Sequence, residues 1–303
     1  MRLDARDFLG RVTFITGPEK DCGKTTLLNA CLALVRRTGE APALMGVGFD
    51  GEARDALSGL RKPRIVVCPG DVFVTAERYL RESRCLPEIL EVLPGSTSLG
   101  RLAIARAGRA GSVTIVGPER NEHAAWAISR IREEGWARTT LVDGAMNRIT
   151  QAAAFAGARF VFALRVSPPD LERQARRACL IAALERVPVY AEGSPDFPAP
   201  AHFVEGPLTY DTAKRIPPEA RTVVVDDFTK VFLDGQALSA LQRERTLAFR
   251  AAVEFGGFVV VLRDLGEEAF RRALGDELAW ARVVFNPYAD PAPGRGAATG
   301  GAA

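Results

Sequence analysis

Histidine is scarce in this sequence, and its cysteines show no pairing pattern. Only two histidines are present, which disfavours a zinc site built from several imidazoles and a hydrolase that uses a histidine-containing triad. The five cysteines are widely scattered and form no Cys-x-x-Cys pair. This distribution indicates reduced thiols, so we expect a cytoplasmic protein.

The sequence also lacks a strong net charge and a long apolar run. Its 40 basic and 37 acidic side chains give a net charge of +3, too small for a surface that coats nucleic acid. The most apolar stretch, residues 152–164, is interrupted by Arg159 and is shorter than the roughly 20 residues that cross a bilayer. The first residues do not resemble a secretory signal peptide. We therefore expect neither a nucleic-acid partner nor a membrane.

The first 165 residues alternate short β-branched runs with helical patterns. Such alternation predicts an α/β fold, in which a mostly parallel sheet carries helices on both faces. A helix is also expected after Ser167, whose hydroxyl can cap it. The expected strands are residues 11–16, 42–47, 64–68, 102–107, 112–116, 139–142 and 159–164, and the expected helices are 24–37 and 119–134.

The clearest motif is ITGPEKDCGKTTLLN, which stands between an expected strand and an expected helix. A loop that wraps phosphate with backbone N–H groups needs glycine where a side chain would block the approach, and Gly17 and Gly23 occupy such positions. Lys24 can reach the terminal phosphates, and Thr25 can place its hydroxyl on Mg²⁺. Thr26 follows in the first helical turn, whose partial positive charge favours anions. The motif predicts a P-loop NTPase sheet that binds ATP and Mg²⁺.

The loop is longer than the standard G-x4-GK[ST] form. Five residues, the last of them Cys22, separate Gly17 from Gly23. A thiol at a helix N-terminus can be reactive, because the helix dipole favours the thiolate. It can instead pack within the loop, and we favour that interpretation.

Acidic residues follow the second expected strand. The segment GVGFDG formally matches the dinucleotide fingerprint G-x-G-x-x-G, but Asp50 would then lie beside a bound pyrophosphate and repel it. In a phosphate-loop protein, Asp50, Glu52 or Asp55 could hold Mg²⁺ directly or through water. The alternative is a solvated acidic turn that begins a helix.

Asp143 is the best candidate for a Walker-B carboxylate. It directly follows the apolar run in TTLVDGAMNR, as such carboxylates commonly do. The alternative is an Asp-Gly turn that ends a strand. Arg148, five residues further on, could sense phosphate as part of the catalytic site, or could cover a helix with its methylene groups.

The proline-rich segment 188–218 is the best candidate for a domain boundary. We expect a P-loop nucleotide-binding domain over residues 1–187 and an α/β part over 188–290, which either extends the sheet or forms a small second lobe. Residues 291–303 lack large apolar side chains, so we expect a disordered tail. In the C-terminal part we expect strands at 222–225 and 258–262 and a helix at 236–255.

Several segments together resemble one family, the P-loop subunit (KamB) of the lysine 5,6-aminomutase reactivase. They are GPEKDCGKTT, GVGFDGEARD, KPRIVVCPGDVFVTAERYL, VGPERN, TTLVDGAMNR and FNPYAD, in this order. The resemblance implies an ATPase that helps to restore a cobalamin- and pyridoxal-phosphate-dependent radical enzyme. It implies the aminomutase and a second reactivase subunit as protein partners, and it leaves a homo-oligomer open.

Three alternatives stay open. The lengthened loop is similar to that of dethiobiotin synthetase, an ATP-dependent ligase, although the lysine that helps to bind substrate in that family has no counterpart in PALMGVG. A GTP-binding cofactor-insertion protein is a second alternative, although the sequence has no NKxD motif to recognise guanine. The third is a P-loop that binds nucleotide weakly and acts as a scaffold.

Overall fold

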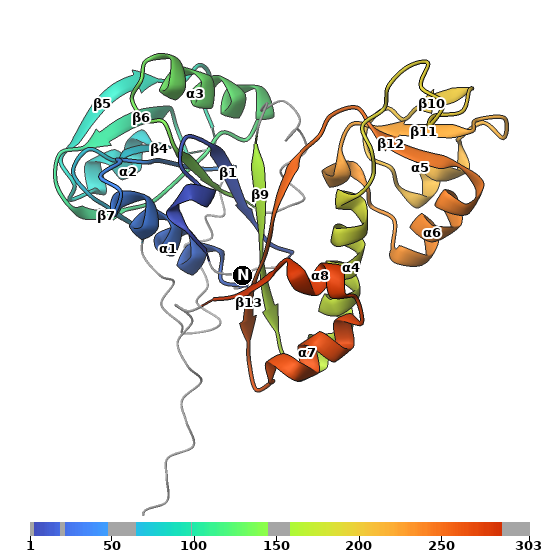
Figure 1. Cartoon of the computed structure of the whole chain (residues 1–303). Helices are drawn as coiled ribbons and strands as arrows, with labels where there is room; N and C mark the ends of the chain where they lie inside the picture. The colour runs from blue at the N-terminus through green and yellow to red at the C-terminus, as the bar shows by residue number, and fades with distance from the viewer. Residues whose placement is uncertain (1–2, 19–21, 48–64, 98, 145–157, 287–303) are drawn as a thin grey trace, which may run out of the picture.

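The structure is a computed structural model that describes residues 3–18, 22–47, 65–97, 99–144 and 158–286 (Figure 1). Its centre is a nine-stranded sheet in which β14 to β4 are parallel and β6 is antiparallel to both β4 and β5. The predicted α/β fold with a mostly parallel sheet is confirmed. The strands, in spatial order, are β14 (Val283–Phe285), β13 (Glu254–Leu262), β9 (Arg159–Val166), β1 (Val12–Thr16), β8 (Thr140–Asp143), β2 (Ala43–Gly46), β4 (Val72–Ala76), β6 (Leu102–Ala107) and β5 (Pro87–Val92).

Helices cover both faces of this sheet, as expected. Successive residues of β1 point to opposite faces, so Phe14 and Ile15 belong to two different apolar clusters. On the Ile15 face, α1 (Lys24–Arg36) buries one side, with α2 (Glu77–Glu82) nearby. The Phe14 face is covered by α3 (Asn121–Glu133), α4 (Leu171–Glu185), α7 (Glu267–Leu274) and α8 (Glu277–Ala281).

Two expected strands pair outside the main sheet. β3 (Ile65–Val67) and β7 (Gly111–Val113) form a separate antiparallel pair. The sequence reasoning missed β4, which follows a turn after β3, and β5, which follows the short helix α2. β5 has the sequence PEILEV, and its proline and two glutamates are depleted in strands generally. Local composition therefore did not reveal it.

The C-terminal part both forms a small lobe and extends the sheet. The lobe holds a three-stranded parallel sheet, with β11 between β10 and β12, and Figure 1 shows it beside the upper end of α4. The chain then returns to the main sheet as β13 and β14. The domain division at residue 188 stays a prediction. The lobe contains β10 (Ala201–Phe203), α5 (Tyr210–Lys214), β11 (Thr222–Val225), α6 (Gly235–Glu244) and β12 (Thr246–Phe249).

The expected helix over residues 236–255 is wrong in its second half. α6 ends at Glu244 because Arg245 is extended, with φ −145° and ψ 149°. The following TLAF run pairs with β11, and Glu254 already begins β13. The expected tail at 291–303 lies outside the described residues. Within the described part of the chain, no helix is both long and apolar enough to span a membrane.

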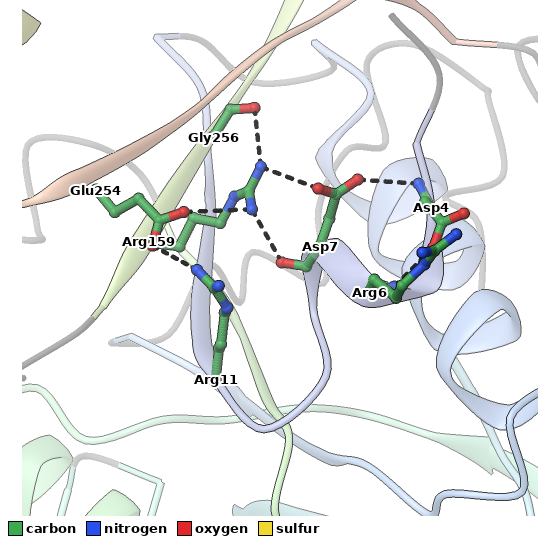
Figure 2. A network of polar contacts seen from close by, with 7 residues as sticks. All are labelled: Asp4, Arg6, Asp7, Arg11, Arg159, Glu254 and Gly256. Atoms are coloured by element: carbon green, nitrogen blue, oxygen red, sulfur yellow. Dashed lines mark hydrogen bonds and ion pairs between the residues drawn. The ribbon is translucent and has the colours of Figure 1, made fainter.

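A network of charges joins the N-terminal segment to the amino edge of the main sheet (Figure 2). Arg159, at the start of β9, is only 9% exposed. Its guanidinium lies 3.3 Å from Asp7 Oδ1 and 3.3 Å from Glu254 Oε1, and it donates to the carbonyl oxygens of Asp7 and Gly256. Arg11 donates to the other oxygen of Glu254 at 2.5 Å. The network holds three sequence-distant segments together.

Candidate functional site

The glycine-rich loop has the structural context that its sequence requires. β1 lies between β8 and β9, and the chain leaves β1 after Thr16 and enters α1 at Lys24. Gly23 is the N-cap of α1, and its carbonyl accepts the first helical hydrogen bond from Leu27 at 2.9 Å. A strand, a loop and a helix N-terminus therefore follow one another at the carboxyl edge of a parallel sheet, where ligands of α/β proteins commonly bind.

Both loop glycines are needed, for different reasons. A Cβ at Gly17 would lie 2.3 Å from Cys22 Sγ and 2.8 Å from the carbonyl oxygen of Ala163, so no side chain fits there. Gly23 has φ +95°, a left-handed conformation that other residues rarely adopt. Gly17 therefore lies against the backbone of β9, and Gly23 turns the chain into α1, positions where a phosphate cradle uses glycine.

Lys24, Thr25 and Thr26 form the half-buried first turn of α1. That turn contains no acidic residue, so no carboxylate there offsets the partial positive charge of the helix N-terminus. The Lys24 ammonium donates to Cys22 Sγ at 3.6 Å. The first turn therefore combines a cation, two hydroxyls and a helix N-terminus, which together suit an anion.

Asp143 lies at the same edge of the sheet as the loop. It is the last residue of β8, in register with Ile15 on one side and Gly46 on the other. Leu141, two residues earlier, packs in the cluster that α1 covers, so strand alternation places Asp143 on the α1 face as well. The structure thus brings this half-buried carboxylate to the edge and face from which Lys24 starts its helix.

Several predicted residues lie outside the described residues: Asp50, Glu52, Asp55 and Arg148. Among the residues that are described, no three His, Cys, Asp or Glu side chains gather as a metal site. The donors present still suit Mg²⁺, which keeps several waters and binds through one or two carboxylates plus substrate phosphates. Asp143 and the Thr25 hydroxyl are donors of that kind.

Sequence reasoning gave no role to Gly117, which also belongs to this edge. A Cβ on Gly117 would lie only 1.6 Å from the carbonyl oxygen of Gly46. The segment before α3 therefore crosses the end of β2, next to the strand that carries Asp143. A glycine after the apolar run SVTIV was the available sign, but a close approach between distant segments is invisible in a local pattern.

The turn after β9 also holds a charged contact at this edge. Ser167 donates to Asp170 at 2.8 Å, and Arg173 donates to its other oxygen at 2.5 Å. The hydrogen bond from Arg173, and then that from Ser167, lower the pKa of Asp170. This carboxylate therefore stabilises the start of α4.

Comparisons with known proteins leave the family open. No family model matches the chain, and no curated protein matches it. Among solved structures, the MinC:MinD cell division complex of Aquifex aeolicus has a chain with a TM-score of 0.32 and 15% identity, covering 87% of this chain and 86% of that one. A nucleotide-binding protein of Archaeoglobus fulgidus in complex with ADP has a TM-score of 0.25 and 12% identity, covering 91% of both chains. Likenesses this slight carry no argument about function.

Proposed function

We propose that the protein is a P-loop ATPase that binds Mg-ATP at the carboxyl edge of its main sheet. The observation that carries the proposal is the loop itself: Gly17 has no room for a side chain, Gly23 is left-handed, and Lys24 begins a helix directly after them. Chance matches to a short glycine motif rarely come with this strand–loop–helix context.

Each residue of the site has a role in this proposal. The loop backbone and the first-turn N–H groups, that of Thr26 included, surround the phosphates, and Lys24 neutralises their charge. Thr25 and Asp143 would hold Mg²⁺, Asp143 directly or through water. The metal would supply positive charge against the negative charge that develops during phosphoryl transfer. Asp50, Asp55 and Arg148 are proposed to complete the metal and phosphate contacts.

Binding and hydrolysis test this core of the proposal. We expect the purified full-length chain to bind Mg-ATP with a measurable heat by titration calorimetry and to release phosphate slowly. EDTA should abolish hydrolysis, and competition with GTP should favour ATP. Absence of binding to either nucleotide would mean that the loop is not a phosphate site.

We further propose that the ATPase reactivates a cobalamin-dependent aminomutase, lysine 5,6-aminomutase. The support is the ordered resemblance of GPEKDCGKTT, TTLVDGAMNR and the other segments to the reactivase subunit. ATP binding and hydrolysis would alternate two conformations that differ in affinity for the mutase, so that a damaged cofactor can leave. Such a protein acts with a second reactivase subunit.

A recovery assay tests this role. The mutase is inactivated by turnover and then mixed with this protein, the second subunit, Mg-ATP and fresh adenosylcobalamin. Turnover should return with ATP and should not return with a non-hydrolysable analogue. Lack of ATP-dependent recovery, in a preparation that hydrolyses ATP, would rule out the reactivase role and favour the ligase alternative.

A further inference from the structure

Cys22 lies inside the core, directly before the N-cap of α1. Its side chain is 3% exposed. It belongs to the same apolar cluster as Leu27 of α1, Ala163 of β9 and Val259 of β13. The cluster that holds this thiol therefore includes residues of three elements of the main fold.

The same thiol contacts both ends of the loop. At the start, Cys22 Sγ occupies the space that a Gly17 Cβ would need. At the end, it accepts a hydrogen bond from Lys24 Nζ at 3.6 Å. The left-handed Gly23 turns the backbone between Cys22 and Lys24, which lets both side chains meet.

We propose that Cys22 is a positioning residue that anchors the lengthened loop to the core and sets the resting position of Lys24. The loop has one residue more than the four-residue form, and a longer loop loses more conformational entropy when it closes around a ligand. Burying the residue next to Gly23 removes part of that cost before the nucleotide arrives. The inference deepens the proposed function and depends on it for its ligand.

Thiol labelling tests the anchor without any nucleotide. The full-length chain is treated with N-ethylmaleimide, and labelling of each cysteine is followed by peptide mapping. Cys22 should react slowly, as should Cys31, which is fully buried and whose thiol pKa is raised by that burial. Half-buried Cys68 is the internal reference for faster labelling. Labelling of Cys22 as rapid as that of Cys68 would overturn the anchor.

Gly17→Ala makes the labelling test specific. The added Cβ collides with Cys22 Sγ and should displace the thiol from its buried position. Because such a local displacement costs less free energy than global unfolding, Cys22 should be labelled at least about tenfold faster. Cys31 should keep its slow rate, which shows that the fold is intact. An unchanged rate at Cys22 would overturn the proposal.

Two matched alanine variants test the effect on the ligand. Cys22→Ala and Cys31→Ala each remove a buried thiol from the same cluster. We expect Cys22→Ala to raise the Kd for Mg-ATP about tenfold, because the loop is then less preorganised. Cys22→Ser retains an acceptor for Lys24, so its Kd should lie between those of the wild type and Cys22→Ala. Cys31→Ala should lower the melting temperature and leave the Kd unchanged. Equal effects on Kd would overturn the anchor.

Labelling in the presence of Mg-ATP separates this proposal from the one it depends on. Bound nucleotide should slow the labelling of Cys22 further, because ligand contacts at Gly23 and Lys24 would hold the neighbouring thiol in its buried position. Faster labelling would mean that the thiol leaves its site on binding, against the anchor. If the wild-type chain binds no nucleotide, the proposed function fails, and the Gly17→Ala labelling result alone decides whether Cys22 anchors the loop.

Discussion

The two edges of the main sheet use charge in opposite ways. At the amino edge, Arg159 is surrounded by Asp7, Glu254 and two carbonyl oxygens (Figure 2), so its charge serves the fold. At the carboxyl edge, Gly17 lies close to the backbone of β9, Gly23 is left-handed, and the Lys24 ammonium donates to the Cys22 thiol. One edge is completed by its own side chains, and the other is shaped to receive an anion.

The largest effect is expected at the carboxyl edge. Lys24→Ala should raise the Kd for Mg-ATP by at least about 100-fold, because it removes the cation that would pair with buried phosphate. The melting temperature of the nucleotide-free protein should stay unchanged. Titration calorimetry and thermal melting measure the two quantities.

Lys214→Ala is the matched control. Lys214 lies on the lobe, and its side chain is 78% exposed. The Lys214→Ala variant should therefore bind nucleotide as tightly as the wild type does. A Lys24→Ala variant that binds as tightly as Lys214→Ala would mean that the carboxyl edge does not receive the anion.

The reverse result is expected at the amino edge. Arg159→Met should lower the free energy of unfolding by about 2 kcal/mol, less than for a fully buried ion pair, because the Asp7 and Glu254 side chains are 24% and 45% exposed. Urea denaturation measures this loss. The Kd for Mg-ATP should not change.

Arg6→Met tests whether position or charge causes that loss. Arg6 pairs with Asp4 in the same N-terminal segment, but its side chain is 89% exposed, so its removal should leave the free energy of unfolding nearly unchanged. If Arg159→Met weakened nucleotide binding as Lys24→Ala does, the two edges would not be separate in function.

A third substitution separates the metal from the phosphate. Asp143→Asn should lower Mg²⁺-dependent hydrolysis by about tenfold and raise the Mg²⁺ concentration needed for half-maximal rate, as loss of a metal-supporting carboxylate commonly does. Nucleotide affinity should fall less than in Lys24→Ala. Asp211→Asn, at a side chain 80% exposed on the lobe, is the control. An unchanged Mg²⁺ dependence would remove Asp143 from the metal site.

The same contrast explains what the sequence could predict. The carboxyl-edge site is local: Gly17, Gly23 and Lys24 stand within eight residues, and an apolar run leads directly to Asp143. Parallel strands then bring their carboxyl ends to one edge without further information. Strand, loop and helix could therefore be placed from the sequence alone.

The amino-edge network could not be predicted in this way. In the sequence, Arg159 only interrupts an apolar stretch, and its partners Asp7 and Glu254 lie in distant segments. The lobe shows the same limit, because Thr246–Phe249 is a strand only through its pairing with Thr222–Val225. Contacts between distant segments decide these features, whereas local patterns decide the loop.

The smallest expected effect concerns Asp170, which brings a fold-stabilising charge to the carboxyl edge. Because Arg173 and Ser167 lower its folded pKa, the carboxylate stabilises the protein at pH values above its unfolded pKa of about 3.9. That stabilisation disappears as the pH falls through the lower, folded pKa. Asp170→Asn should therefore have a slightly lower melting temperature than the wild type at pH 7. The difference should vanish at pH values below the folded pKa of Asp170. Thermal melts at several pH values test this.

The nucleotide affinity of Asp170→Asn shows whether Asp170 serves only the fold or also the ligand site. It lies in the turn after β9, not in the glycine loop, so Asp170→Asn should bind Mg-ATP as the wild type does. A higher Kd would mean that the phosphate site extends from the loop after β1 to the turn after β9. An unchanged Kd would confine the site to the loop after β1 and the end of β8. It would also show that Asp170, although it lies at the carboxyl edge, stabilises the fold without contributing to nucleotide binding.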